Sequence, residues 1–252
     1  MDYGTKLSKS DGELLSDSTP YRRIIGKLLY LSNTRPDISF AIGKLSQFLD
    51  CPTTEYLRAA HRILRYVKGS PAAGLFFSAK SDLNLTGFSD SDWAGCPNSR
   101  RSISAYCFYL GSSLISWKSK KQLTVAASSS EEEYRVLALA TREVQWLSYV
   151  LQELGAPLQK ATNIYCDSKS AVYIATNPVF HERTKHIEAD CHIVRDKLQE
   201  GVINLLPIST HEQVADILTK PLAPGPFHYI HGKLGLLNIF AVSTPSLREG
   251  VT

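Results

Sequence analysis

The hydrophobic pattern of the chain changes period twice, and these changes limit its fold more than any single motif. Apolar residues recur at helical spacing over residues 21–75, alternate as in strands from about residue 83, and then alternate between helical and strand segments from about residue 131. Between these two changes we predict three strands. The second and third strands are joined by a turn at Gly111. Strands joined by hairpins and followed by helix, strand, helices, strand and helix predict an α/β fold: a mixed five-stranded sheet with helices on both faces, preceded by a small helical region.

The same pattern divides the chain into four parts. Residues 1–20 are polar and without period, so we expect a linker or a frayed end. Residues 21–75 form the helical region, and residues 80–223 form the α/β domain. Residues 224–252 are expected to be a C-terminal tail.

Composition excludes several other classes of protein. The 252 residues are 43% hydrophobic and 21% charged, as in ordinary globular domains. No apolar run approaches the roughly 20 residues that span a bilayer, and the first residues lack the apolar segment of a secretory signal. Five scattered cysteines without a C-x-x-C pair indicate reduced thiols in an intracellular setting. The net charge of +4 permits a polyanionic partner without establishing one.

The longest predicted helix carries a carboxylate on its apolar face. The apolar stripe of this helix consists of Leu137, Ala140, Val144, Leu147, Leu151 and Leu154. Glu133 lies four residues before Leu137 and therefore continues the stripe. A buried acid is costly unless it is paired or bound to a metal. The alternative is a capping box, because Ser130-x-x-Glu133 fits that motif.

Four further acidic residues lie where predicted elements meet. Asp90 and Asp92 point to the same side of the first strand, unless they belong to a turn. Asp167 follows a short strand, where α/β sheets place their ligands, although it also fits the N-cap of the next helix. Asp216 lies in a helix predicted over residues 211–220, where an ion pair with Lys220 is the alternative.

Such a group of acids has a chemical consequence if the sheet brings it together. Three or four neighbouring carboxylates raise one another's pKa and cannot all stay ionised without cations. Mg²⁺ prefers oxygen ligands and keeps water molecules for chemistry on phosphates. Two such ions would hold the attacking and the leaving oxygen of an in-line displacement.

Two groups of cations also suggest contacts with nucleic acid. A helix predicted over residues 54–68 has an apolar stripe of Leu57, Ala60, Leu64 and Val67. Arg58, Arg62 and Arg65 form a basic stripe opposite it. Near the end of a predicted strand, Trp117 is followed by Lys118, Lys120 and Lys121. Both groups are either solvated surface or contacts for a phosphate backbone.

Several segments resemble one known family in their order along the chain. GFSDSDWAGCPNSRRSIS, ISWKSKKQLTVAASSSEEEY, IYCDSKSAVYIATNP, RTKHIE and ADILTKPL resemble the ribonuclease H domain of Ty1/copia-type retrotransposon Pol polyproteins, especially those of plants. Upstream, YRRIIGKLLYLSNTRPDISFAIGKLSQFL and AAHRILRYVKG resemble the thumb- or connection-like tail of the reverse transcriptase in the same polyprotein. The resemblance covers about residues 20–240. It implies that the polymerase active site belongs upstream and that this chain is a C-terminal fragment or a truncated copy.

The resemblance implies a ribonuclease H-like fold and a catalytic, metal-binding set of four acids. By position these acids are Asp90, Glu133, Asp167 and Asp216. Asp90 is preferred to Asp92 because the acid of the family is the first one, within the strand. Glu133 is preferred to the two preceding glutamates because it directly precedes Tyr134.

The resemblance also implies the chemistry of this set. Asp90 would bridge two Mg²⁺ ions, or Mn²⁺, with Glu133 and Asp167 on one ion and Asp216 on the other. Water activated by one ion would attack the RNA strand of an RNA–DNA hybrid. The implied partners are that hybrid and the upstream reverse transcriptase domain, with no membrane, in a cytoplasmic particle or the nucleus.

Two other functions are compatible with the same fold. A catalytically silent remnant would keep the fold and the basic surface and bind nucleic acid without cleaving it. An integrase-like transferase shares the fold, but its acids follow the order Asp, Asp, Glu, whereas Glu133 is second here. The order of the acids therefore favours ribonuclease H.

Overall fold

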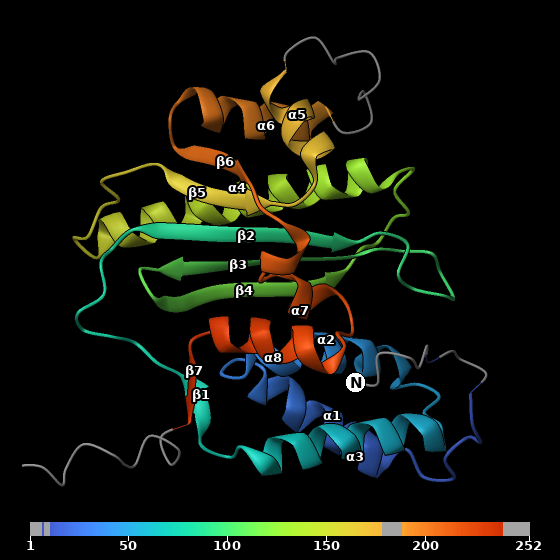
Figure 1. Cartoon of the computed structure of the whole chain (residues 1–252). Helices are drawn as coiled ribbons and strands as arrows, with labels where there is room; N and C mark the ends of the chain where they lie inside the picture. The colour runs from blue at the N-terminus through green and yellow to red at the C-terminus, as the bar shows by residue number, and fades with distance from the viewer. Residues whose placement is uncertain (1–6, 8–10, 178–187, 239–252) are drawn as a thin grey trace, which may run out of the picture.

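The computed structural model describes residue 7, residues 11–177 and residues 188–238. The helical region contains α1 (Thr19–Leu31), α2 (Ser39–Leu45) and α3 (Thr54–Gly69), which pack around their own hydrophobic core. Figure 1 shows these helices below the sheet, with α3 farthest from it. The helices that the periodicity predicts for this part of the chain are therefore present.

The buried face of α3 differs from the predicted stripe. Tyr56, Ala60 and Ile63 are buried, whereas Leu64 is 39% exposed. The prediction counted only aliphatic residues, but the ring of Tyr56 stacks on Phe48 with 4.2 Å between the ring centroids. An aromatic anchor therefore rotates the buried face of the helix away from Leu64.

Part of the expected linker is joined to the helical region. The backbone N–H of Leu15 donates to the carbonyl of Pro52 at 3.0 Å, and the N–H of Thr54 donates to the carbonyl of Glu13 at 2.9 Å. Residues 13–15 are thus paired with the segment that leads into α3, so this part of residues 1–20 is not a frayed end.

The main sheet has five strands in the order β4-β3-β2-β5-β6. These strands are β2 (Leu85–Asp92), β3 (Ile103–Leu110), β4 (Ser113–Lys121), β5 (Thr162–Cys166) and β6 (Ile203–Pro207). β2, β3 and β4 are antiparallel, whereas β5 and β6 run parallel to β2. The predicted mixed five-stranded sheet is confirmed.

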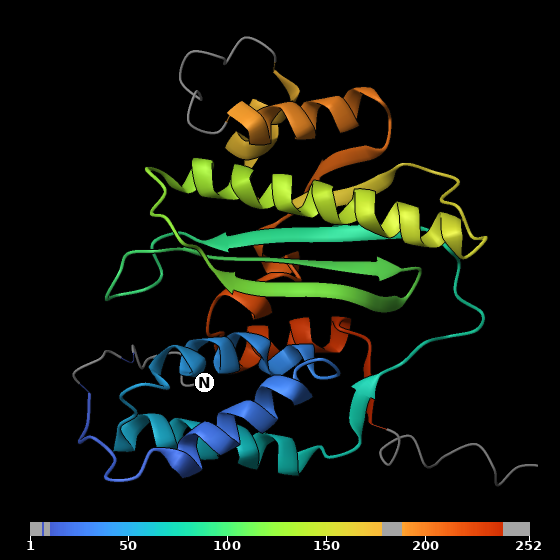
Figure 2. The ribbon, with the colours of Figure 1, turned by 180° about the vertical axis from the view of Figure 1, so that it is seen from behind.

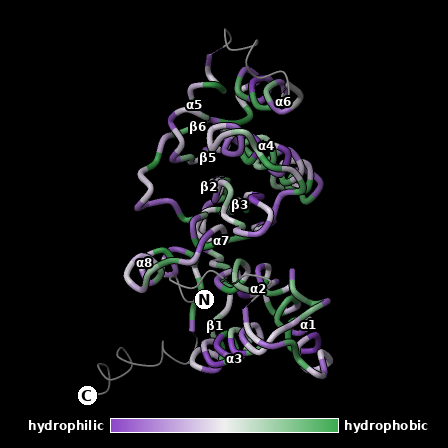
Figure 3. Tube along the Cα trace, turned by 90° about the vertical axis from the view of Figure 1, so that its right-hand side faces the viewer, coloured by the Kyte–Doolittle hydropathy of each residue, from purple (hydrophilic) through white to green (hydrophobic). Residues whose placement is uncertain are grey.

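Helices cover both faces of the sheet, as predicted. One face carries α4 (Ser129–Glu153), α5 (Lys169–Thr176) and α6 (Glu188–Gln199), with a shared hydrophobic core. The short α7 (Asp216–Thr219) and α8 (Pro224–Lys233) pack on the opposite face. Figures 2 and 3 show α4 on one side of the strands and α7 and α8 between the sheet and the helical region.

The C-terminal segment is more structured than a tail in its described part. After α8, β7 (Leu236–Asn238) pairs antiparallel with β1 (Ala73–Leu75) at the end of the helical region. This two-stranded sheet, visible at the lower left of Figure 1, joins segments that lie far apart in the sequence.

The helix predicted over residues 211–220 is interrupted. A 3₁₀ turn spans Thr210–Glu212, and α7 begins only at Asp216. Gln213 has an extended backbone, and its side chain is used in tertiary contacts. Its Nε2 donates to the carbonyl of Ser89 at 2.9 Å, and its Oε1 accepts from the N–H of Ala215 at 3.2 Å. These contacts pin the start of α7 to β2.

Candidate active site

The sheet topology brings the ends of two parallel strands together. Ser89 of β2 is in register with Cys166, the last residue of β5. The next residues along the two strands are Asp90 and Asp167, so both acids lie at the same sheet edge. α4 starts near this edge on one face of the sheet and α7 starts near it on the opposite face, which adds Glu133 and Asp216. All four predicted site acids are therefore brought together from four elements.

Asp90 is the most enclosed acid of the cluster. It is 2% exposed, and its Oδ2 accepts a hydrogen bond from the hydroxyl of Thr219. Burial raises the pKa of Asp90, which the positive charge of Lys220 and the hydrogen bond from Thr219 oppose. The neighbouring Asp167 raises this pKa further.

Glu133 projects from the first turns of α4 toward β2. Its Oε1 accepts from the backbone N–H and the hydroxyl of Ser91, at 3.2 and 3.0 Å. Its Oε2 is buried without a hydrogen-bond partner among the described residues. Burial and the charge of Asp90 raise the pKa of Glu133 to about 8.

The capping-box alternative for Glu133 is wrong. The N–H of Glu131 donates to the hydroxyl of Ser128 at 3.2 Å, and Oε2 of Glu131 accepts from the N–H of Ala127 at 2.8 Å. The cap of α4 therefore uses residues two positions earlier than the predicted motif. Glu133 lies beyond the cap, on the face that meets the sheet.

Glu132, the middle one of the three successive glutamates, lies in a different environment from Glu133. Glu132 is fully buried, and its Oε1 accepts from the hydroxyl of Ser104 on β3 at 2.6 Å. Gln122 donates to the same hydroxyl at 2.7 Å. The three successive glutamates thus have three different partners, and only Glu133 meets the other site acids.

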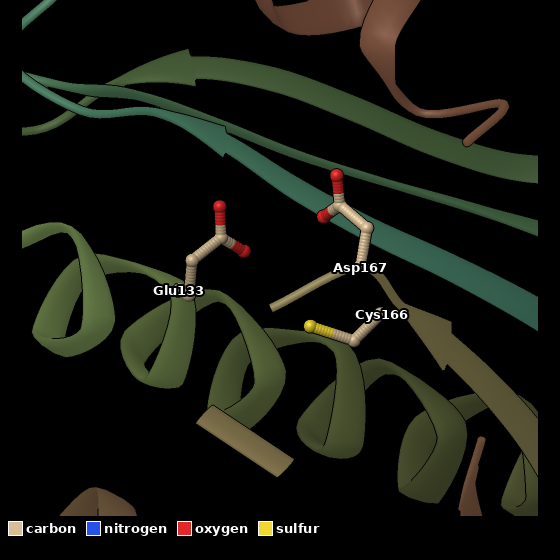
Figure 4. A group of neighbouring side chains, drawn as sticks. All are labelled: Glu133, Cys166 and Asp167. Atoms are coloured by element: carbon tan, nitrogen blue, oxygen red, sulfur yellow. The ribbon is translucent and has the colours of Figure 1, made fainter. Parts of the chain in front are cut away.

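Asp167 follows β5 and faces the Glu133 carboxylate (Figure 4). It is half-buried, and its Oδ2 accepts from the hydroxyl of Thr210 at 2.9 Å. The N-cap of α5 is Ser168, whose hydroxyl accepts from the N–H of Ala171 at 3.3 Å. The N-cap alternative for Asp167 is therefore wrong.

Asp216 begins α7 and is 4% exposed. Its Oδ1 forms an ion pair with Nζ of Lys220 at 2.8 Å, which is the i,i+4 pair considered from the sequence. Burial and the charge of Asp90 nevertheless raise the pKa of Asp216 to about 7. The ion pair and membership of the cluster therefore coexist.

Asp92 is turned toward a tight turn after β2. A Cβ atom at Gly95 would lie 1.8 Å from Oδ2 of Asp92, so the carboxylate occupies the space that this glycine leaves. The neighbouring Ala94 has a positive φ of 55°. Asp92 thus contributes to a turn, the alternative considered from the sequence, whereas Asp90 contributes to the cluster.

Sequence reasoning missed Cys166. One oxygen each of Glu133 and Asp167 and the sulfur of Cys166 lie within 4.8 Å of one another (Figure 4). Burial and the charge of Glu133 raise the pKa of Cys166 to about 12, so the thiol stays protonated. A protonated thiol is a poor ligand for a hard cation. Strand alternation could have placed Cys166 on the α4 face, because Ile164 and Cys166 point to the same side.

The polar groups around the acids were not foreseen. Thr219, Thr210, Ser91 and Gln213 hold or position the site acids; Ser91 comes from β2 and the other three from the stretch of residues 210–219. Nothing in their spacing marks them, because each contact depends on tertiary packing.

The donor set fits a divalent, oxygen-preferring cation. Four carboxylates converge, Glu133 has a buried oxygen without a partner, and Asp90 raises the pKa of both Glu133 and Asp216. Each observation indicates negative charge in excess of the local positive charge. Carboxylate oxygens are ligands that Mg²⁺ and Mn²⁺ accept.

The predicted basic residues lie on different surfaces. Lys118 and Lys120 are exposed on β4. Lys120 pairs with Ser104 of β3, and Ser104 pairs in turn with Ser91 of β2, next to the site. Lys121 is half-buried, and its Nζ donates to Gln47 and to the sulfur of Cys96, each at 2.9 Å. It thus joins the helical region to the α/β domain, which leaves it less suited to contact phosphates.

The arginine stripe lies on α3, away from the sheet (Figure 1). Arg58, Arg62 and Arg65 are exposed, and Arg58 forms an ion pair with Glu55 at 2.8 Å. No described helix is long and apolar enough to cross a membrane.

The chain is similar to several proteins of known sequence or structure. No family model matches the chain. The Pol polyprotein of transposon RE1 from Arabidopsis thaliana is 47% identical over 93% of the chain, and that of transposon TNT 1-94 from Nicotiana tabacum is 39% identical over 86%. The chain spans 16% of the length of each of these relatives. Among solved structures, a ribonuclease H1 in complex with an RNA/DNA hybrid is 15% identical, with a TM-score of 0.41 over 54% of the chain and 94% of that protein.

The strand order and the helices on both faces of the sheet give the chain a ribonuclease H-like α/β fold with an attached helical region. The sequence relatives are more specific than the fold. Over most of its length the chain is homologous to retrovirus-related Pol polyproteins from Ty1/copia-type transposons.

Proposed function

We propose that this chain is a metal-dependent endoribonuclease that cleaves the RNA strand of RNA–DNA hybrids as part of a retrotransposon Pol polyprotein. The observation that carries the proposal is the convergence of Asp90, Glu133, Asp167 and Asp216 at one sheet edge. Such a concentration of acids is unfavourable without cations. The acids are suited to hold these cations against a phosphodiester.

Each acid has a distinct structural role in the proposed site. Asp90 lies centrally, because its charge affects the pKa of both Glu133 and Asp216. Ser91 holds one oxygen of Glu133, and the other oxygen is buried without a hydrogen-bond partner among the described residues. Asp167 lies at the more accessible side of the group, since it alone is half-buried. Divalent cations, when bound, would polarise the phosphate and favour ionisation of water.

The substrate side of the proposal depends on the family and on exposed cations. Lys118 and Lys120 lie at the sheet edge that carries the acids, where they would contact the backbone of a bound hybrid. The arginine stripe on α3 would contact nucleic acid that extends beyond the site. Selectivity for RNA in a hybrid is taken from the family resemblance, because no described contact distinguishes RNA from DNA.

The polyprotein context supplies the remaining proposals. The upstream reverse transcriptase domain is the proposed protein partner, and the helical region would be the tail of that domain. An intracellular location, in a cytoplasmic particle or the nucleus, also stays a proposal.

A cleavage assay tests the proposed function. The full chain is incubated with an RNA–DNA hybrid labelled on the RNA strand, with Mg²⁺, Mn²⁺ or EDTA. We expect cleavage of the RNA only with a divalent cation, and none of single-stranded RNA or duplex DNA. Binding of the hybrid without cleavage would support the silent remnant instead. Joining of DNA ends in a strand-transfer assay would support the integrase-like alternative.

A further inference from the structure

Lys220 supplies a positive charge to one half of the acid cluster. Its Nζ lies 2.8 Å from Oδ1 of Asp216 and 3.9 Å from Oδ2 of Asp90. The same oxygen of Asp90 accepts the hydrogen bond from Thr219. The two acids assigned to the second metal ion are therefore already paired with groups of the protein.

Among the described residues, no cation is paired with the other half of the cluster. Oε2 of Glu133 is buried without a hydrogen-bond partner, and neither Glu133 nor Asp167 forms an ion pair with a cation among the described residues. Oxygens of these two acids lie within 4.8 Å of each other. Within the part of the chain that the structure describes, the cluster is thus asymmetric, with a paired cation on the Asp216 side and none on the Glu133 side.

We infer that Lys220 occupies the second cation position of the metal-free protein. The cluster would bind one divalent ion between Glu133, Asp167 and Asp90, and a second ion only when the ammonium group leaves Asp216. The inference rests on the proposed function and adds to it an internal competitor for one of the two ions.

Charge and geometry both support this role. Four ionised carboxylates carry four negative charges, so Lys220 and one divalent ion together neutralise three of them. A second ion would meet the ammonium at close range, where like charges repel strongly even at a partly exposed site. The Lys220 side chain is 32% exposed, and its flexible stem allows it to move into solvent.

Calorimetric titration with Mn²⁺ tests the inference on the full chain. Wild type is compared with Lys220→Met and with Lys160→Met, which removes the same charge from an exposed loop before β5. We expect wild type and Lys160→Met to bind one ion, and a second at least about tenfold more weakly. In Lys220→Met the second ion should bind about tenfold more tightly or better, because the competing charge is gone. Lys220→Arg, which keeps the charge, should resemble wild type.

The possible failures are distinguishable. Equal isotherms for wild type and Lys220→Met, or equal shifts in Lys220→Met and Lys160→Met, would overturn the role of Lys220 alone. Binding of no ion by any of the proteins would overturn the proposed metal site.

A second measurement uses unmodified protein in case Lys220→Met does not fold. The rate of reductive methylation of Lys220 is followed by peptide mass spectrometry during the Mn²⁺ titration. We expect slow labelling while Lys220 is paired with Asp216, and labelling at least several-fold faster once the second ion binds. A rate that does not change across both binding steps would contradict displacement of the ammonium.

Discussion

Nε2 of His231 lies 3.6 Å from Oδ2 of Asp37, so a residue of α8 meets a buried acid of the helical region. Arg35 and Tyr66 bond the same oxygen at 2.7 and 2.6 Å. This contact and the β1–β7 pair join the C-terminal segment to the helical region. A buried acid with three partners makes the junction sensitive to pH.

We expect Asp37 to stabilise the protein above about pH 4. Burial opposes its ionisation, but His231, Arg35 and Tyr66 outweigh that effect and lower the pKa of Asp37 to about 2. Because the folded pKa lies below the unfolded value, this contribution is complete above the unfolded pKa and is lost as the pH falls from about 4 to 2. Its size should be about 2 kcal/mol.

Urea unfolding at several pH values measures this contribution. The free energy of unfolding of wild type should fall more steeply between pH 4 and 2.5 than that of Asp37→Asn. The variant should also be less stable at pH 7, because Arg35 then loses its buried partner. Parallel pH profiles for the two proteins would show that Asp37 does not contribute in this way.

Mg²⁺ or Mn²⁺ should raise the melting temperature of the full chain, because the ion relieves repulsion among the site acids. At about ten times its dissociation constant, one ion stabilises the folded state by about 1.4 kcal/mol. For a chain of this size the expected rise is about 3 to 6 °C.

Scanning calorimetry with and without millimolar Mg²⁺ checks this rise. Asp90→Asn should lose most of it, whereas Asp196→Asn, an exposed acid on α6, should keep it. Unchanged melting of wild type in millimolar Mg²⁺ would count heavily against a metal site.

Asp90 and Asp92 should respond differently to the same substitution. Asp90→Asn removes the central charge of the cluster and should slow hybrid cleavage by roughly a thousandfold or more, since each 1.36 kcal/mol is about tenfold. Asp92→Asn weakens a turn and should cost about tenfold. Cleavage of a labelled hybrid at equal folded concentration compares the two variants. If Asp92→Asn abolished cleavage and Asp90→Asn reduced it only about tenfold, Asp92 and not Asp90 would be the acid of the cluster.

If Arg58, Arg62 and Arg65 contact phosphates, their replacement should reduce the salt dependence of hybrid binding. The slope of log affinity against log salt should fall by up to about three in the triple glutamine variant. Lys118→Gln with Lys120→Gln should reduce it by up to about two. Fluorescence anisotropy in EDTA over a range of salt concentrations gives these slopes. A slope identical to wild type would make the arginine stripe a solvated face.

The order of helices and strands followed from local pattern alone. The periods of 3.6 and 2 residues depend on neighbouring side chains, so the hairpin at Gly111 and the long helix before β5 could be predicted. The class of fold also followed, because few sheet topologies accept hairpin-joined strands followed by alternating helices and strands. Buried faces were predicted less well where an aromatic residue such as Tyr56 formed part of the core.

Identifying the candidate site required both the sequence and the tertiary structure. Residue type and order in the sequence identified Asp90, Glu133, Asp167 and Asp216 as candidates. Only the tertiary structure decided among the alternatives for Glu133 and Asp167, because the caps of α4 and α5 turned out to use Ser128 and Ser168.

The charge balance of the site was decided by the tertiary structure alone. The sequence by itself determined that Lys220 could pair with Asp216, since residues four apart meet on a helix. It could not determine that Asp90, 130 positions before Lys220, lies 3.9 Å from the same ammonium group. That distance depends on Gln213, which bonds to β2, interrupts the predicted helix and starts α7 beside the strand. Contacts between distant segments follow from packing, which local periodicity does not encode.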